Sequence, residues 1–136
     1  MTVPGADSTL VFICGSALRG QPDHANLAEA EFVGAAQTQP HYRLHAVKNG
    51  WHPGIYAVAT GGIAIPGELY RLSAAQYEHL LATEPPDMYP ATVKLVGGGE
   101  AIAILYPREL IERDNEPDIS HYGGWATYKA AQAKVE

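Results

Sequence analysis

The sequence has a single cysteine, Cys14, so it cannot form an internal disulfide or a metal site built on several cysteines. Basic residues are also scarce, because nine Lys and Arg stand against fifteen Asp and Glu and give a net charge of -6. This charge disfavours nucleic acid and anionic membrane surfaces as partners. The apolar run at residues 10–14 is far too short to span a bilayer, and Asp7 precedes it where a signal peptide would carry positive charge. We therefore expect a cytoplasmic protein.

The chain nevertheless has enough apolar side chains for one folded core. Hydrophobic residues make up 46% of the sequence and charged residues 18%, which is typical of a globular domain and not of a disordered chain. Residues 1–8 contain Pro and Gly without periodicity, so we expect a loosely ordered tail there. Residues 9–136 are then expected to form a single domain.

Short apolar or alternating runs, bounded by glycine and proline, predict a protein with many strands. The predicted strands are residues 9–14, 32–38, 41–47, 55–60, 63–70, 92–96 and 101–106. Three consecutive glycines at residues 97–99 lie between the last two strands and favour a hairpin turn, because glycine readily adopts the positive φ that such turns need.

Two helices are predicted. Ser73 and Gln76 form a capping-box pattern that starts the first helix, and this helix must end by Glu84, because two prolines follow. Aromatic residues at helical spacing predict a closing helix within residues 122–133. Many strands, two helices and no regular βαβ alternation indicate an α+β fold with a curled or closed sheet.

Glu84 is the strongest candidate for a catalytic residue. It continues the apolar spacing of Tyr77, Leu80 and Leu81, which aims its carboxylate toward the core. Burial raises the pKa of a carboxyl group, and a carboxylate tuned toward neutrality can act as a general base on an ammonium or amide. The alternative is a glutamate at a frayed helix end, exposed to water.

The loop after the first strand is a candidate anion site. Backbone N–H groups of Gly15, Ser16, Ala17 and Leu18 can converge on a carboxylate or oxyanion, with Arg19 and the Ser16 hydroxyl assisting. Glycine and serine also dominate ordinary turns, so a plain turn is the alternative.

Other reactive side chains give weaker signals. His41 and His45 share one face of a predicted strand, but Arg43 lies between them and opposes a cation, so we expect surface histidines and no metal. Cys14 ends a buried strand, where a small apolar role is favoured over a nucleophilic one. Tyr89 is either a pocket hydroxyl or an aromatic residue of the core or rim.

Three motifs, taken in order, resemble the γ-glutamylcyclotransferase-like superfamily. They are Cys-Gly-Ser-Ala-Leu-Arg-Gly at residues 14–20, Gly-Glu-Leu-Tyr at 67–70, and Leu-Leu-Ala-Thr-Glu at 80–84 with Tyr89. Within that superfamily, residues 11–128 look most like the C-terminal domain of allophanate hydrolase, here free-standing. This likeness includes His-Tyr-Arg-Leu at 41–44 and Tyr-Gly-Gly-Trp at 122–125. The resemblance implies a mixed β-barrel with flanking helices and a small cavity floored by the Gly-Ser loop.

The resemblance also implies roles for individual residues. In family cyclotransferases the loop amides hold the substrate, and the glutamate takes a proton from the α-amino group that attacks the γ-carbonyl. This assigns substrate binding to the loop from Gly15 to Leu18 and the base to Glu84. Two positions differ from the family patterns: Cys14 replaces a tyrosine, and Ala17 replaces a histidine common in allophanate hydrolase domains.

The leading hypothesis is a small enzyme, without cofactor, that acts on a carboxylate-bearing amide metabolite of the γ-glutamyl type. A second hypothesis is a free-standing domain that acts on allophanate or N-carboxyurea. A third is a non-catalytic module that binds a ligand or supports an amidase partner. The sequence leaves open whether the protein forms a homodimer.

Overall fold

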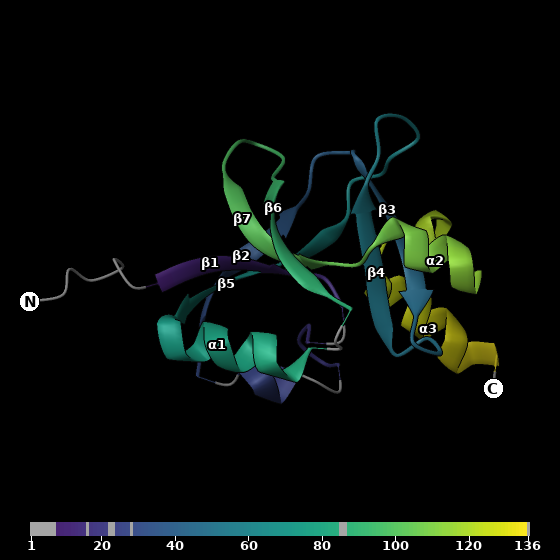
Figure 1. Ribbon diagram of the computed structural model, residues 1–136. Helices are drawn as coiled ribbons and strands as arrows, with labels where there is room; N and C mark the ends of the chain where they lie inside the picture. Colours follow the sequence, from purple (N-terminus) through teal and green to yellow (C-terminus); the bar gives the residue numbers. More distant parts are fainter. Residues whose placement is uncertain (1–7, 16, 22–23, 28, 85–86, 136) are drawn as a thin grey trace, which may run out of the picture.

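The computed structural model describes residues 8–15, 17–21, 24–27, 29–84 and 87–135 (Figure 1). The rest of the chain, including residues 1–7 of the predicted tail at 1–8, lies outside this description. The strands are β1 (Ser8–Ile13), β2 (Glu31–Gln37), β3 (Tyr42–Val47), β4 (His52–Ala57), β5 (Pro66–Ser73), β6 (Tyr89–Lys94) and β7 (Glu100–Leu105). The α-helices are α1 (Ala74–Thr83), α2 (Arg108–Asp114) and α3 (Trp125–Val135), with short 3-10 helices η1 (His24–Leu27) and η2 (Ser120–Tyr122). In this part of the chain no helix is long and apolar enough to cross a membrane.

The strands form two sheets that confirm the predicted mixture of strands and helices. Five strands lie in the order β2-β5-β1-β7-β6, with β1 antiparallel to β5 and parallel to β7. The hairpin β3-β4 forms a separate two-stranded sheet. Helix α1 packs against β1 and β5, while α2 contacts β4 (Figure 1). The end of β1 therefore lies in the interior of the larger sheet, near the second sheet.

The larger sheet curls until its two edges meet at one point. Thr38, just after β2, forms an isolated bridge with Leu95, just after β6. The Val96 N–H donates to the Gln37 carbonyl at 2.9 Å beside this bridge. Among the described residues no continuous ladder joins β2 to β6, so the closed barrel implied by the family resemblance is not confirmed.

Helix α1 begins and ends where the sequence predicts. The Ser73 hydroxyl accepts from the Gln76 N–H, and the Gln76 side-chain carbonyl accepts from the Ser73 N–H at 2.7 Å. Glu84 is the C-cap, with φ -78° and ψ 151°, so the backbone has already left the helix at this residue. Leu80 is buried in the core on the inner face of the helix.

Three strands and one helix differ from the sequence prediction. Strand β6 begins at Tyr89, three residues before its predicted start. Strand β4 lies three residues before its predicted position, because Pro53 and Gly54 lie inside it instead of marking a turn, and β5 lies three residues after its predicted position. The turn before β4 instead uses positive φ at Lys48, Asn49 and Gly50. Helix α2 was not predicted, since its seven residues are too few for a clear periodic pattern.

Candidate functional site

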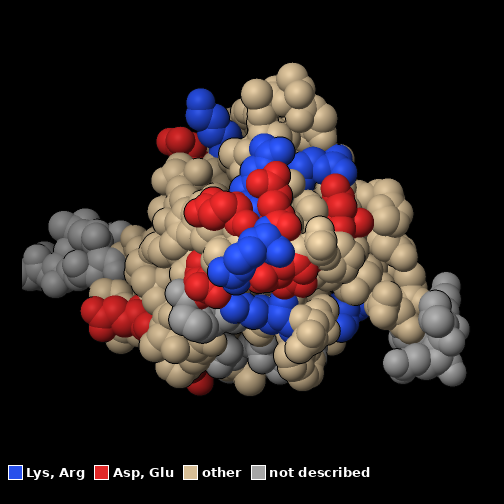
Figure 2. Space-filling view, turned by 45° about the vertical axis from the view of Figure 1, so that its right-hand side comes forward, with Lys and Arg blue, Asp and Glu red and all other residues tan. Residues whose placement is uncertain are grey.

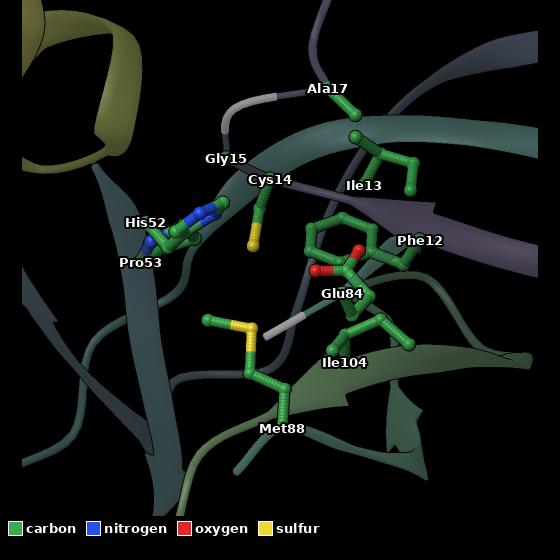
Figure 3. Close-up of a pocket in the computed structure, with 10 residues that line it drawn as sticks. All are labelled: Phe12, Ile13, Cys14, Gly15, Ala17, His52, Pro53, Glu84, Met88 and Ile104. Carbon is green, nitrogen blue, oxygen red and sulfur yellow. The ribbon is translucent and has the colours of Figure 1, made fainter. Parts of the chain in front are cut away.

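A small cavity of about 40 Å³ lies at the end of β1 (Figure 3). Its walls come from β1, the following loop, the start of β4, the end of α1 and the segments at β6 and β7. The lining residues are Phe12, Ile13, Cys14, Gly15, Ala17, His52, Pro53, Glu84, Met88 and Ile104. Most of this surface is apolar, so the few polar groups that enter the cavity stand in partly desolvated surroundings.

Glu84 supplies the carboxylate of this cavity. The side chain extends from the C-cap of α1 into the cavity, and the residue is half-buried (Figure 3). The extended backbone at this position turns the side chain away from the path of the helix. The sequence analysis expected the Glu84 side chain to continue the apolar face of the helix. In the structure, the C-cap conformation of Glu84 directs this side chain to the cavity instead.

The thiol of Cys14 faces the same cavity (Figure 3). Burial and the nearby negative charge of Glu84 together raise the pKa of Cys14 to about 12. The thiol therefore stays protonated at neutral pH, which disfavours a nucleophilic role, because the thiolate is the reactive form. A neutral thiol beside a carboxylate can act as a weak hydrogen-bond donor.

The loop after β1 forms a tight turn. The Leu18 N–H donates to the Gly15 carbonyl at 3.0 Å, so this amide is used by the turn itself. Gly15 and Ala17 line the cavity, and the Leu18 side chain is buried in the core. Ser16 lies outside the described residues. Of the four predicted loop positions, the structure thus places Gly15 and Ala17 next to Glu84.

Arg19 and Tyr89 do not line this cavity. The Arg19 backbone N–H and Nε donate to the carboxylate of Glu68, at 3.2 and 2.9 Å, and its guanidinium lies 4.2 Å from the centre of the Phe32 ring. Tyr89 is 41% exposed at the start of β6, and the preceding residue, Met88, lines the cavity instead. The structure therefore separates these two predicted site residues from Glu84.

Arg19 instead belongs to a polar network on β5. Burial would raise the pKa of Glu68, but hydrogen bonds from Arg19 and from the Tyr70 hydroxyl outweigh this effect and lower that pKa. Burial and the Glu68 carboxylate raise the pKa of Tyr70 to about 12. Both Arg19 and Glu68 also line a second cavity, of about 230 Å³, that Gly67, Gly124 and Trp125 border as well.

The prediction that His41 and His45 both lie on the surface is wrong for His45, which is only 8% exposed. Its Nδ1 lies 2.9 Å from the Glu116 carbonyl, and its Nε2 lies 3.2 Å from the Tyr56 hydroxyl. Arg43, two residues before it on β3, donates to Asp118 at 2.6 Å. Across the residues that the structure describes, no group of three or more His, Cys, Asp or Glu side chains is arranged to hold a metal ion.

The charged residues on the face shown in Figure 2 are mixed in sign. Red and blue side chains lie next to each other there and do not form one broad basic area (Figure 2). Ion pairs of the described residues include Lys48–Asp87 at 2.8 Å and Arg43–Asp118 at 2.6 Å. This face gives no electrostatic basis for binding a nucleic-acid backbone.

The sequence analysis did not single out His52 or Met88 individually as cavity residues. His52 opens β4 and faces the cavity (Figure 3). The Pro53 ring packs directly on Gly15, where an added Cβ would overlap it. This contact brings β4 to the loop. The only local signal was the pair Pro53-Gly54, and its usual meaning as a turn hid this contact.

The fold and the cavity define a small α+β domain whose inner strand β1 ends at a carboxylate-bearing cavity. A family model described as the allophanate hydrolase C-terminal domain matches residues 9–130. Gamma-glutamylaminecyclotransferase C of Danio rerio is 32% identical over 118 residues, which cover 79% of this chain and 78% of that protein. The chain belongs to the family of allophanate hydrolase C-terminal domains and is related to this cyclotransferase.

Solved structures support the same relationship. The crystal structure of a uropathogenic E. coli-specific protein has a TM-score of 0.83 at 30% identity, and the match covers 96% of this chain and 98% of that one. The allophanate hydrolase of Kluyveromyces lactis has a TM-score of 0.84 over 96% of this chain. That match has 22% identity and covers 22% of the larger chain, so it shows the fold alone.

Proposed function

We propose that the protein is a cyclotransferase that acts on a γ-glutamyl amine or a similar carboxylate-bearing amide, with Glu84 as its general base. The observation that carries this proposal is the Glu84 carboxylate inside the cavity beside the loop after β1 (Figure 3). The relationship to gamma-glutamylaminecyclotransferase C supports the choice of substrate class.

The chemistry requires a base at one nitrogen and a new bond at one carbon. Glu84 takes a proton from the α-ammonium group, and the resulting amine attacks the γ-carbonyl carbon. The attacking nitrogen passes its second surplus proton to water, and the bond from that carbon to the second nitrogen breaks as this nitrogen gains a proton, which yields 5-oxoproline and the free amine. A general base in the correct place contributes roughly 10²- to 10⁴-fold to such a proton transfer.

The dimensions of the cavity fit the reacting groups and not a whole large substrate. One water molecule needs roughly 10–15 Å³ of such a cavity, so the volume of about 40 Å³ holds a few atoms. We place the γ-amide beside Glu84, with the substrate carboxylate near the amides of the loop at Gly15 and Ala17. The departing amine then extends out of the cavity.

The test is the appearance of 5-oxoproline in proton NMR spectra. Wild-type protein incubated with γ-glutamyl ethylamide or with pooled γ-glutamyl amino acids is expected to release 5-oxoproline. Glu84→Gln keeps the shape of the side chain but removes its basicity, so turnover should fall by about 10²-fold or more. Glu78→Gln, at an exposed position on α1, is the matched control. Equal turnover by Glu84→Gln and wild type would contradict the role of Glu84.

A second candidate is the processing of allophanate or N-carboxyurea. The match of residues 9–130 to the allophanate hydrolase C-terminal domain favours it. Allophanate is therefore incubated with the protein in a separate tube, beside a protein-free blank. Faster loss of allophanate, without activity on γ-glutamyl amines, would favour this second function. Two unchanged spectra would favour a binding or assembly module for an amidase.

A further inference from the structure

His52 is an imidazole that enters the same cavity as Glu84 from a different element. It is the first residue of β4 and is half-buried, while Glu84 comes from the end of α1. Both side chains, together with the Cys14 thiol, surround the cavity in Figure 3. The cavity thus combines a carboxylate with an imidazole, the side chain that most readily changes protonation near neutral pH.

The backbone around His52 is held tightly on both sides. Pro53 packs on Gly15, where a Cβ would overlap its ring. At Gly54 a Cβ would lie 2.6 Å from Val47 Cγ1 and 3.2 Å from Ile111 Cδ1, so this residue is also enclosed. These contacts fix the start of β4 against the loop and against α2. The position of His52 at the cavity is therefore a consequence of tertiary packing and not of an exposed loop.

An ion pair joins the turn before His52 to the segment before β6. Lys48, in the turn before β4, contacts Asp87 at 2.8 Å, and Asp87 precedes the cavity residue Met88. The described titratable groups that line the cavity with His52 are Glu84 and Cys14. Of these, Cys14 remains neutral, because its pKa is raised to about 12.

We propose that His52 is the general acid that protonates the departing amine in the reaction assigned to Glu84. This role rests on the proposed function. As the α-amine forms its bond to the γ-carbon, the π electrons of the carbonyl move onto the oxygen, and the attacking nitrogen passes its surplus proton to water. The electrons then return to carbon and expel the second nitrogen. That nitrogen takes the proton from His52 as its bond to carbon breaks. His52 is restored when the proton held by Glu84 passes to it or is exchanged with water.

A departing amine that is weakly basic needs less help from an acid, and this difference provides the test. We would compare kcat/KM for γ-glutamyl ethylamide and for γ-glutamyl trifluoroethylamide, which are similar in size but differ in the basicity of the amine. His52→Asn should lose about 100-fold on the ethylamide and less than about 10-fold on the trifluoroethylamide. His79→Asn, at an exposed histidine on α1, should lose nothing on either substrate.

Equal losses by His52→Asn on the two substrates would show a merely structural role and would overturn the proposal. Unchanged turnover of the ethylamide would overturn it as well. In both cases the wild type is active, so the proposed function stands. If the wild type releases no 5-oxoproline from either substrate, the function itself is overturned, and the role of His52 with it.

A measurement on the wild type keeps the proposal testable if His52→Asn does not fold. A neutral imidazole cannot donate a proton in place of the imidazolium ion, so kcat/KM for the ethylamide should fall as pH rises through the titration of an imidazole. The trifluoroethylamide should show a weaker fall over the same range. Identical pH profiles for the two substrates would contradict general-acid catalysis by His52.

Discussion

Gly15 and Pro53 are packed so closely that any Cβ at residue 15 would overlap the proline ring. The two residues are 38 positions apart in the sequence (53 minus 15), and their contact joins the loop after β1 to the start of β4. Both line the cavity, as do their neighbours Cys14 and His52. The contact therefore fixes the relative position of a thiol and an imidazole that come from separate sheets.

Gly15→Ala should destabilise the protein and weaken its activity. Forcing an extra methyl into a packed site typically costs about 1–3 kcal/mol. Pro53→Ala removes the atoms with which this methyl collides, so the double variant should be more stable than the sum of the single effects predicts. Urea denaturation of the four proteins in this cycle measures the coupling. Additive losses would mean that the two residues do not press on each other.

Ser73→Ala should lower the free energy of unfolding by about 1 kcal/mol, because it removes the hydroxyl that caps α1. Ser73→Thr keeps a hydroxyl and should lose much less. Because Ser73 is at the opposite end of the helix from Glu84, KM for a substrate should not change in either variant. Urea denaturation combined with steady-state kinetics checks both statements. A large change in KM would show that the cap also positions the cavity.

The elements that the sequence predicted well have local causes. The apolar run of β1 and the capping box of α1 are each encoded within a few neighbouring residues. The position of β4 depends instead on contacts of Pro53 and Gly54 with residues far away in the sequence. A proline and a glycine in succession normally indicate a turn, so the local pattern favoured the wrong boundary.

The candidate site was predictable only in part for the same reason. Glu84 and the loop at Gly15 could be proposed from helical spacing, turn composition and family resemblance. His52 enters the cavity only because tertiary packing brings β4 to the loop, and no short motif encodes that contact. Arg19 shows the opposite case, since it follows the loop directly but binds Glu68 on β5.

Asp118 should make the protein sensitive to acid. Burial would raise the pKa of this carboxyl, but hydrogen bonds from Arg43 and Ser120 outweigh that effect and lower it to about 2 from a usual value of 3.8. The folded state thus favours the ionised form. Its contribution to stability is present above pH 4 and is lost as pH falls toward 2.

Asp118→Asn should therefore reduce Tm near neutral pH and reduce the further loss of Tm between pH 4 and pH 2. Glu109→Gln, at an exposed position on α2, serves as the control and should keep the wild-type acid profile. Melting curves at several pH values compare the three proteins. Parallel acid profiles for wild type and Asp118→Asn would contradict a special contribution from this carboxylate.

Cys14 should react very slowly with alkylating reagents in the folded protein. Its pKa of about 12, against a usual value of 9.0, reduces the thiolate fraction near neutral pH by about a thousandfold, and burial limits access further. Glu84→Gln removes the negative charge that opposes ionisation, so it should lower this pKa and accelerate alkylation. Glu78→Gln leaves the cavity unchanged and should not.

The measurement is the rate of iodoacetamide labelling as a function of pH, followed by mass spectrometry, with protein unfolded in urea as the reference for a free thiol. A similar rate in Glu84→Gln and wild type would mean that burial alone protects Cys14. A higher rate in Glu84→Gln, with an unchanged Tm, would instead locate the ionised carboxylate beside the thiol in solution. That placement is also what proton transfer by Glu84 inside the cavity requires.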